Sequence, residues 1–177
     1  HPDTIEFAGD YNLESMILHN HANKGIDQRH KGVDIKALVQ EFNIYESIYK
    51  PAITGSMVIL DATNLINKLP IQGTERLSFK LSTPGAHKAA HIVDCSEESG
   101  HPMHIYKLTN KQQIQQGVLL YTLHFCSREF LRNIRTRVSQ AYSGTIDQAV
   151  RSIFADENYL DSKMVLNYQK TRNKDKI

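Results

Sequence analysis

The segment Phe42–Ser82 constrains the fold of this chain more than any other part of the sequence. Apolar and polar residues alternate along Phe42–Tyr49 and Arg76–Leu81, and Thr54–Leu60 is rich in residues that favour strands. A short helical turn is predicted at Asp61–Leu69, between the last two strands. The segment holds no nucleophile beside a base and no glycine loop opening a helix. A segment of this kind is typical of a structural surface rather than of an active site.

Further strands are predicted on both sides of this segment. Their patterns indicate strands at Tyr11–His19, Ala89–Cys95, His104–Leu108 and Val118–Phe125. One helical turn is expected at Asp34–Gln40. Strands that recur at intervals of about 10–15 residues favour a mostly antiparallel sandwich or barrel.

After Cys126 the spacing of the apolar residues becomes that of a helix. From Ser127 to Tyr142 the apolar residues fall on one stripe, and Gly144 is a plausible end for this helix. Thr145 and Gln148 have the spacing of a capping box, which predicts that a second helix begins there. The predicted fold class is therefore α+β and mainly β, an antiparallel barrel or sandwich followed by two helices.

Three parts are expected along the chain. Residues 1–32 form an N-terminal arm with a first strand and a loop, and residues 33–126 form the β-barrel domain. Residues 127–177 are the helical start of a following domain. Nothing closes these helices into a core of their own, so we expect the chain to end inside a larger protein.

Composition argues against several classes of protein. Lys and Arg number 21 against 19 Asp and Glu, and a net charge of +2 gives no general reason to expect nucleic acid as the main partner. The longest apolar runs, Met57–Leu60 and Gly117–Tyr121, are too short to cross a membrane, so we expect no membrane insertion. Two cysteines, Cys95 and Cys126, are too few for a disulfide framework and indicate assembly in a reducing environment.

The sharpest candidate for chemistry is a set of histidines around one cysteine. Zinc takes three or four such ligands, and a metal-dependent hydrolase using His87, His91, Cys95 and His104, with His101 nearby, is the alternative function. On a strand, however, His91 and Cys95 share a face from which His87 is remote. We favour partly exposed histidines with Cys95 as a small buried hydrophobe, and expect neither metal nor cofactor.

Three other groupings have a simpler structural explanation. Ser96–His101 offers serines, glutamates and a histidine, but its composition is that of a hairpin loop. His19-Asn20-His21 spells HNH without the spacing of the nuclease of that name. Asp61 and Glu75 are too isolated to be argued as a general acid–base pair. We expect no catalytic residues.

Three arginines form the last candidate site. Arg128, Arg132 and Arg135 fall within about 60° of one another on a helical wheel. Such a stripe is a candidate contact for phosphate or for an acidic protein partner, and with the basic tail it would suit a nucleic-acid-binding module. A solvated helix edge is the interpretation that we favour.

The order of these motifs resembles one family. IYESIYKPAITGSMVILDATNLINKLPIQGTERLSF (Ile44–Phe79) is similar to the N-terminal part of baseplate hub proteins from contractile-tailed bacteriophages. REFLRNIRTRVSQAYSGTIDQAVRSIF (Arg128–Phe154) resembles the next element of the same family, in which a helix and the phrase VSQAYSG lead into a second helix. The resemblance spans roughly Asp34–Leu160, and its motifs carry weight through their order.

This resemblance implies a structural role in the virion. The family implies a homotrimeric ring at the tail tip, whose β-barrel domains imitate the tail-tube fold and whose lumen passes DNA. Tail-tube or tube-initiator subunits would bind one side, the central spike protein the other, and baseplate wedge proteins the rim. The ring would assemble in the host cytoplasm. The family has no catalytic residues to carry over, and the C-terminal part expected of it is missing from this chain.

Overall fold

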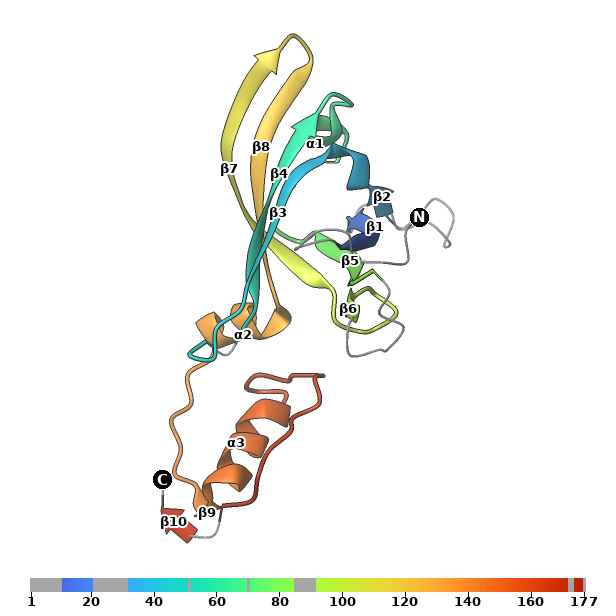
Figure 1. Ribbon diagram of the computed structural model, residues 1–177. Helices are drawn as coiled ribbons and strands as arrows, with labels where there is room; N and C mark the ends of the chain where they lie inside the picture. The colour runs from blue at the N-terminus through green and yellow to red at the C-terminus, as the bar shows by residue number, and fades with distance from the viewer. Residues whose placement is uncertain are drawn as a thin grey trace.

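The structure is a computed structural model that describes residues 11–20, 32–50, 52–69, 71–84, 92–171 and 174–176. Its main feature is an antiparallel sheet of eight strands (Figure 1). These strands are β1 (Asn12–His19), β2 (Gly32–Asp34), β3 (Val39–Tyr45), β4 (Thr54–Asp61), β5 (Arg76–Ser82), β6 (Ile92–Cys95), β7 (Met103–Gln115) and β8 (Val118–Cys126). The strand order is β2-β1-β5-β7-β8-β4-β3, and β6 pairs with β5 beside the start of β7.

Short helices and a small second sheet complete the described structure. A 3-10 helix (Lys36–Leu38) precedes β3, and α1 (Leu65–Lys68) connects β4 to β5. After the eight-stranded sheet come α2 (Arg128–Arg135), β9 (Ser143–Thr145), α3 (Ile146–Ala155) and β10 (Lys174–Lys176), with β9 and β10 paired. The prediction of a mainly β, antiparallel α+β fold is confirmed.

Most predicted strands are present, but several boundaries differ. β3 ends at Tyr45 rather than Tyr49, because the chain turns at Ser47–Lys50, where the Lys50 amide donates to the Ser47 carbonyl (3.1 Å). β7 continues to Gln115, seven residues beyond the predicted strand, because β8 pairs with it along that length. Residues 89–91 lie outside the described part of the chain.

The helical region also differs from the prediction. α2 ends at Arg135, where the Thr136 amide donates to the Arg132 carbonyl, so the stripe predicted up to Tyr142 is not one helix. Gly144 does not end that helix either, since it lies in β9 with φ +137°. The capping box is confirmed: the Thr145 amide donates to Gln148 Oε1 (3.2 Å) at the start of α3.

Three phenylalanine rings show that the sheet curls onto itself. Phe42 in β3 stacks on Phe125 in β8 with centroids 5.2 Å apart, and meets Phe79 in β5 edge-on at 5.0 Å. In the strand order, β7, β8 and β4 lie between β5 and β3. Rings from such distant strands touch only if the sheet folds around one core, as the curved ribbon shows (Figure 1). Within the described residues β2 and β3 do not pair with each other.

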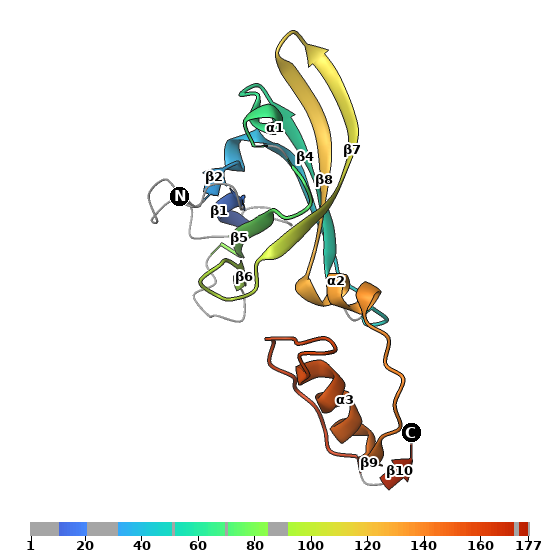
Figure 2. The ribbon, with the colours of Figure 1, turned by 180° about the vertical axis from the view of Figure 1, so that it is seen from behind.

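The β7–β8 hairpin extends past the rest of the sheet (Figures 1 and 2). Its pairing has three irregularities in β7, the first between Ile105 and Lys107, and Gly117 turns the chain with φ +79°. Residues 110–117 are all exposed. The tip of the hairpin therefore has no part in the core. β5 pairs with β7 only at the base of the hairpin, whereas β4 pairs with β8 from Leu119 to Cys126.

Gly55 provides a test of the curled core. It lies in β4 opposite Phe125, and a Cβ at this position would collide with the Phe125 ring and with the Asn43 carbonyl oxygen. We expect Gly55→Ala to destabilise the fold by about 1–3 kcal/mol, since ring and strand must both move. Urea unfolding measures the change, with Ser56→Ala on the same strand as the control. Equal stability of the two variants would contradict the packing described.

Candidate functional site

The predicted metal site has only two described members. His87 and His91 lie outside the described residues, while Cys95 ends β6 and His104 lies in β7. Among the described residues, no three His, Cys, Asp or Glu side chains gather as a group that could hold a metal ion. Burial raises the pKa of the Cys95 thiol to about 11, with the charge of Asp94 adding to the effect. Cys95 is therefore a protonated, buried thiol at neutral pH.

His104 is likewise kept uncharged by its surroundings. Burial lowers the pKa of its imidazole, and the positive charges of Arg76 and Arg128 lower it further. A neutral imidazole remains chemically capable of binding a metal or accepting a proton. The described residues bring no carboxylate or second histidine into a metal-binding group with it.

The stretch Ser96–His101 is a tight turn between β6 and β7. Ser99 Oγ donates to the Ser96 carbonyl (2.8 Å), and the Ser96 amide donates to Asp94 Oδ1 (3.0 Å). Gly100 takes φ +78°, and Glu97 pairs with Arg76. The Ser99 amide donates to Ser96 Oγ (3.1 Å), so the side chains of Ser96, Glu97 and Ser99 are occupied in holding the turn and its neighbour strand.

The HNH stretch lies at the end of a strand. His19 Nε2 makes a 2.8 Å hydrogen bond with Ser78 Oγ on the neighbouring strand β5. His21 lies outside the described residues. The one described histidine of this motif thus has a cross-strand partner, which accounts for its place in the sheet.

Asp61 is a fully buried carboxylate that binds backbone amides. It ends β4 and accepts hydrogen bonds from the amides of Thr63 (3.0 Å), Leu65 (2.9 Å) and Ile66 (3.1 Å), at the start of α1. Burial alone would raise the pKa of Asp61, but these donors outweigh it and hold the pKa below its usual value. Tyr121 Oη also donates to Asp61 (3.4 Å).

Glu75 is a second buried carboxylate that binds backbone amides, in the turn after α1. Its two carboxylate oxygens accept hydrogen bonds from the amides of Gln72 (2.9 Å) and Gly73 (2.8 Å), and the residue is fully buried. Its backbone carbonyl accepts from the Ile105 amide (3.0 Å) of β7. Asp61 and Glu75 therefore rigidify the two turns that flank α1, and each is occupied by main-chain donors.

Two arginines of the predicted stripe are bound by a later segment of the chain. Arg128 pairs with Asp161, and Arg132 Nε donates to the Tyr159 carbonyl (2.9 Å) while its terminal nitrogen donates to the Glu157 carbonyl. Arg135, the third arginine, is exposed at the end of α2. Two arginines of the stripe thus bind one carboxylate and two main-chain carbonyls of the same chain.

Asp161 is the centre of this contact. Besides Arg128, it pairs with Lys163 (2.7 Å) and lies 4.0 Å from Arg132. The hydrogen bond from Lys163 and the charges of Arg128 and Arg132 hold the pKa of Asp161 below its usual value. Close by, Ser162 Oγ donates to Glu129 Oε1 (2.7 Å). The sequence carries no local signal for this cluster, because Arg128 and Glu129 lie about thirty residues before their partners Asp161 and Ser162.

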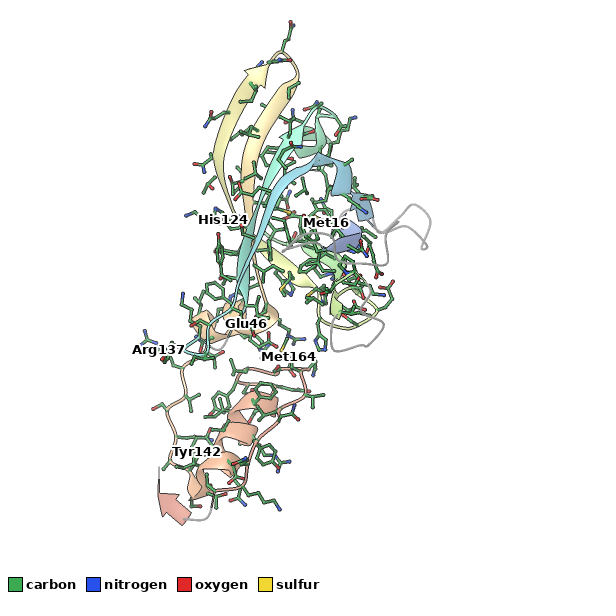
Figure 3. The ribbon with its side chains drawn as sticks, in the orientation of Figure 1. Met16, Glu46, His124, Arg137, Tyr142 and Met164 are labelled. Atoms are coloured by element: carbon green, nitrogen blue, oxygen red, sulfur yellow. The ribbon has the colours of Figure 1, made fainter. Side chains whose placement is uncertain are left out.

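A cavity of about 500 Å³ lies beside the cluster. Its walls come from the β6–β7 turn, from the start of α2 and from the segment after α3. Met164, labelled in Figure 3, lies at this junction between the sheet and the α3 region. The lining mixes apolar groups with charged side chains of both signs, and includes Cys95, His101, His104, Arg128, Glu129 and Lys163.

Several large apolar side chains are exposed in two other places. Ile48 and Tyr49, in the turn between β3 and β4, are 92% and 89% exposed, and Ile114 near the hairpin tip is 51% exposed. The β3–β4 turn and α2 lie at the same end of the sheet, since Thr54 pairs with Cys126 and the Ser127 amide donates to the Ile53 carbonyl.

Comparison with known proteins adds no family assignment. A scan against protein-family models finds no match. A search of curated proteins finds no similar sequence either. In the described part of the chain, none of the helices is long and apolar enough to cross a bilayer.

Asp61 yields a prediction with a defined pH dependence. We expect D61N to lower the free energy of unfolding by about 2–3 kcal/mol at pH 7, because an amide cannot accept from all of these donors. The folded pKa lies below the ordinary value of 3.8, so the carboxylate stabilises the fold above that pH. This stabilisation is lost as the pH falls through the folded pKa, and the difference from wild type narrows.

Urea unfolding at pH 7 and pH 3 measures both effects. Glu46→Gln is the matched control, since Glu46 is an exposed residue of the β3–β4 turn and loses the same charge (Figure 3). A D61N deficit equal to that of the control, or one independent of pH, would contradict the role assigned to the buried carboxylate.

Proposed function

We propose that this chain is a structural subunit of a phage tail-tip hub, forming a homotrimeric ring between the tail tube and the central spike. In this proposal the curled sheet is a barrel domain of the tail-tube type, and wedge proteins bind the rim. The motifs that resemble the hub family lie in β3–β5 and in α2–α3, in the order that the family has. The location is the virion, after assembly in the host cytoplasm.

The observation that carries the proposal is the pair of unlike open edges on one sheet. β7 pairs with β5 only at Met103 and His104, so beyond Ile105 no other described strand occupies that edge. β3 pairs with β4 on one side, and no described strand occupies its other side. A closed ring needs two different complementary surfaces on each subunit, and open strand edges readily pair with another chain.

The surface of the β7–β8 hairpin is compatible with a wet ring interior. Residues 110–117 read NKQQIQQG, which is polar apart from Ile114, and all are exposed. A hairpin that leaves its own core gains its stability from neighbours, and a second copy of the chain would provide them. Such a hairpin would present neutral amides and few charges to DNA passing through the lumen.

The hydrogen bonds made by the potentially reactive side chains also support a structural role. The side chains of Asp61, Glu75, Ser96 and Ser99 all bind backbone groups of turns. These contacts shape the ends of strands, where a ring subunit must hold its loops in fixed positions. The chain therefore uses these polar side chains to hold its own backbone.

The direct test is the mass of the assembly. Native mass spectrometry of the chain alone, and after mixing with tube and spike proteins, is expected to give a trimer. Electron microscopy of the mixture should show a threefold ring attached to a tube. A monomer under all of these conditions would rule the proposal out.

A variant locates the contact at the hairpin. Ile114→Lys places a charge on the exposed apolar residue near the β7 edge, and we expect the subunit dissociation constant to rise roughly tenfold or more. Ile134→Lys makes the same change at an exposed isoleucine on α2 and serves as the control. If both variants weaken assembly equally, or if neither does, the hairpin is not the contact.

A further inference from the structure

The α3 region is joined to the eight-stranded sheet by few connections. Residues 136–142 form neither helix nor strand, and residues 137–141 are all exposed. Among the described helices and strands, the main neighbour of α3 is β9, which directly precedes it and belongs to the small second sheet. Figures 1 and 2 show this extended connection from α2 to the α3 region. The extended connection at residues 136–142 would by itself allow α3 to move as a unit.

Residues 156–164, here called the strap, follow α3 and are fixed to it. The Leu160 amide donates to the Ile153 carbonyl (3.2 Å), and the Ser162 amide donates to the Phe154 carbonyl (2.9 Å). Asp161 takes φ +43°, a conformation that Asp and Asn tolerate better than most residues. Because these bonds are between main-chain groups, the strap and α3 form one body whatever happens to the side chains.

The strap meets α2 through polar contacts. The Asp161 carboxylate holds Arg128, the carbonyls of the strap hold Arg132, and Ser162 binds Glu129, while Lys163 pairs with Asp161 within the strap itself. Asp161 is 8% exposed, whereas the side chains of Arg128 and Lys163 are 42% and 58% exposed. Such pairs at a solvent edge weaken when salt screens them, and they reform without repacking a core.

The strap also closes one side of the cavity. Lys163 and Met164 line it together with Cys95 and Met103, which belong to the sheet. Cys95 is only 6% exposed in this arrangement. If the strap moved away, this side of the cavity would open to solvent, while Cys126, which is fully buried and outside the lining, would stay covered.

We propose that the strap and α3 form a hinged lid that the Asp161 cluster latches onto α2. Residues 136–142 are the hinge. With the latch closed, Arg128 and Arg132 are occupied by the strap, and the strap closes one side of the cavity. With the latch open, both guanidinium groups and the cavity face solvent. The lid is independent of the ring proposed above, since every contact in it lies within one chain.

The test uses Cys95 as a reporter of the open lid and Cys126 as a reporter of the sheet. Asp161→Asn removes the charge of the latch and retains a residue that tolerates the same backbone conformation. Glu157→Gln removes the same charge from the strap but leaves the contact intact, since Arg132 binds the main-chain carbonyl of Glu157. The full chain is treated with N-ethylmaleimide, and the labelling rate of each cysteine is measured by peptide mass spectrometry.

The latch predicts selective exposure of one thiol. In D161N, labelling of Cys95 should be roughly tenfold faster or more than in wild type, with Cys126 unchanged. In E157Q both rates should equal those of wild type. Equal Cys95 rates in D161N and E157Q would overturn the proposal. So would a matching acceleration of Cys126, because the whole sheet would then have loosened.

Salt gives a second measurement that needs no variant. Raising sodium chloride should speed Cys95 labelling in wild type, because it screens the latch, and should leave Cys126 unchanged. D161N, whose latch is already lost, should respond much less. A wild-type Cys95 rate that does not depend on salt would contradict an ionic latch, even if D161N did not fold.

Discussion

The contacts among Phe42, Phe79 and Phe125 are the interaction on which the rest of the structure depends. They bring edge strand β3 against β5, although β7, β8 and β4 lie between them in the sheet. A sheet curled this tightly has a small interior, which these rings and their aliphatic neighbours fill. Gly55 is required where Phe125 lies against β4. The β7–β8 hairpin is longer than this core and must leave it, which exposes a strand edge.

Buried carboxylates fix the ends of the strands that the core aligns. Asp61 and Glu75 have no cationic partner among their described hydrogen bonds, and are held by amides of the turns on either side of α1. A carboxylate withdrawn from water is stable only where several donors converge on it. Tyr121 adds a donor from β8 to Asp61, so this turn is also tied across the sheet.

The contact between α2 and the strap is of a different kind. It joins partners far apart in the sequence through charged and polar groups at a solvent edge. Hydrophobic contacts hold the sheet under most conditions, whereas the proposed latch is expected to respond to ionic strength and to single charges. In this proposal the molecule combines a rigid sheet with a region whose position depends on electrostatics.

The sequence by itself determined most strands of the large sheet, their antiparallel character and the capped start of α3, because alternation and capping are local patterns. It also indicated that Ser96–His101 is a loop. It did not predict the short strands β2, β9 and β10. It did not reveal the length of β7, since the exposed residues 110–115 lack an apolar alternation and are strand only by pairing with β8. Nor did it show that Arg128 and Arg132 bind the strap, or that Asp61 and Glu75 bind turns. Only the tertiary structure decided these points, because each depends on groups that the folded chain brings together.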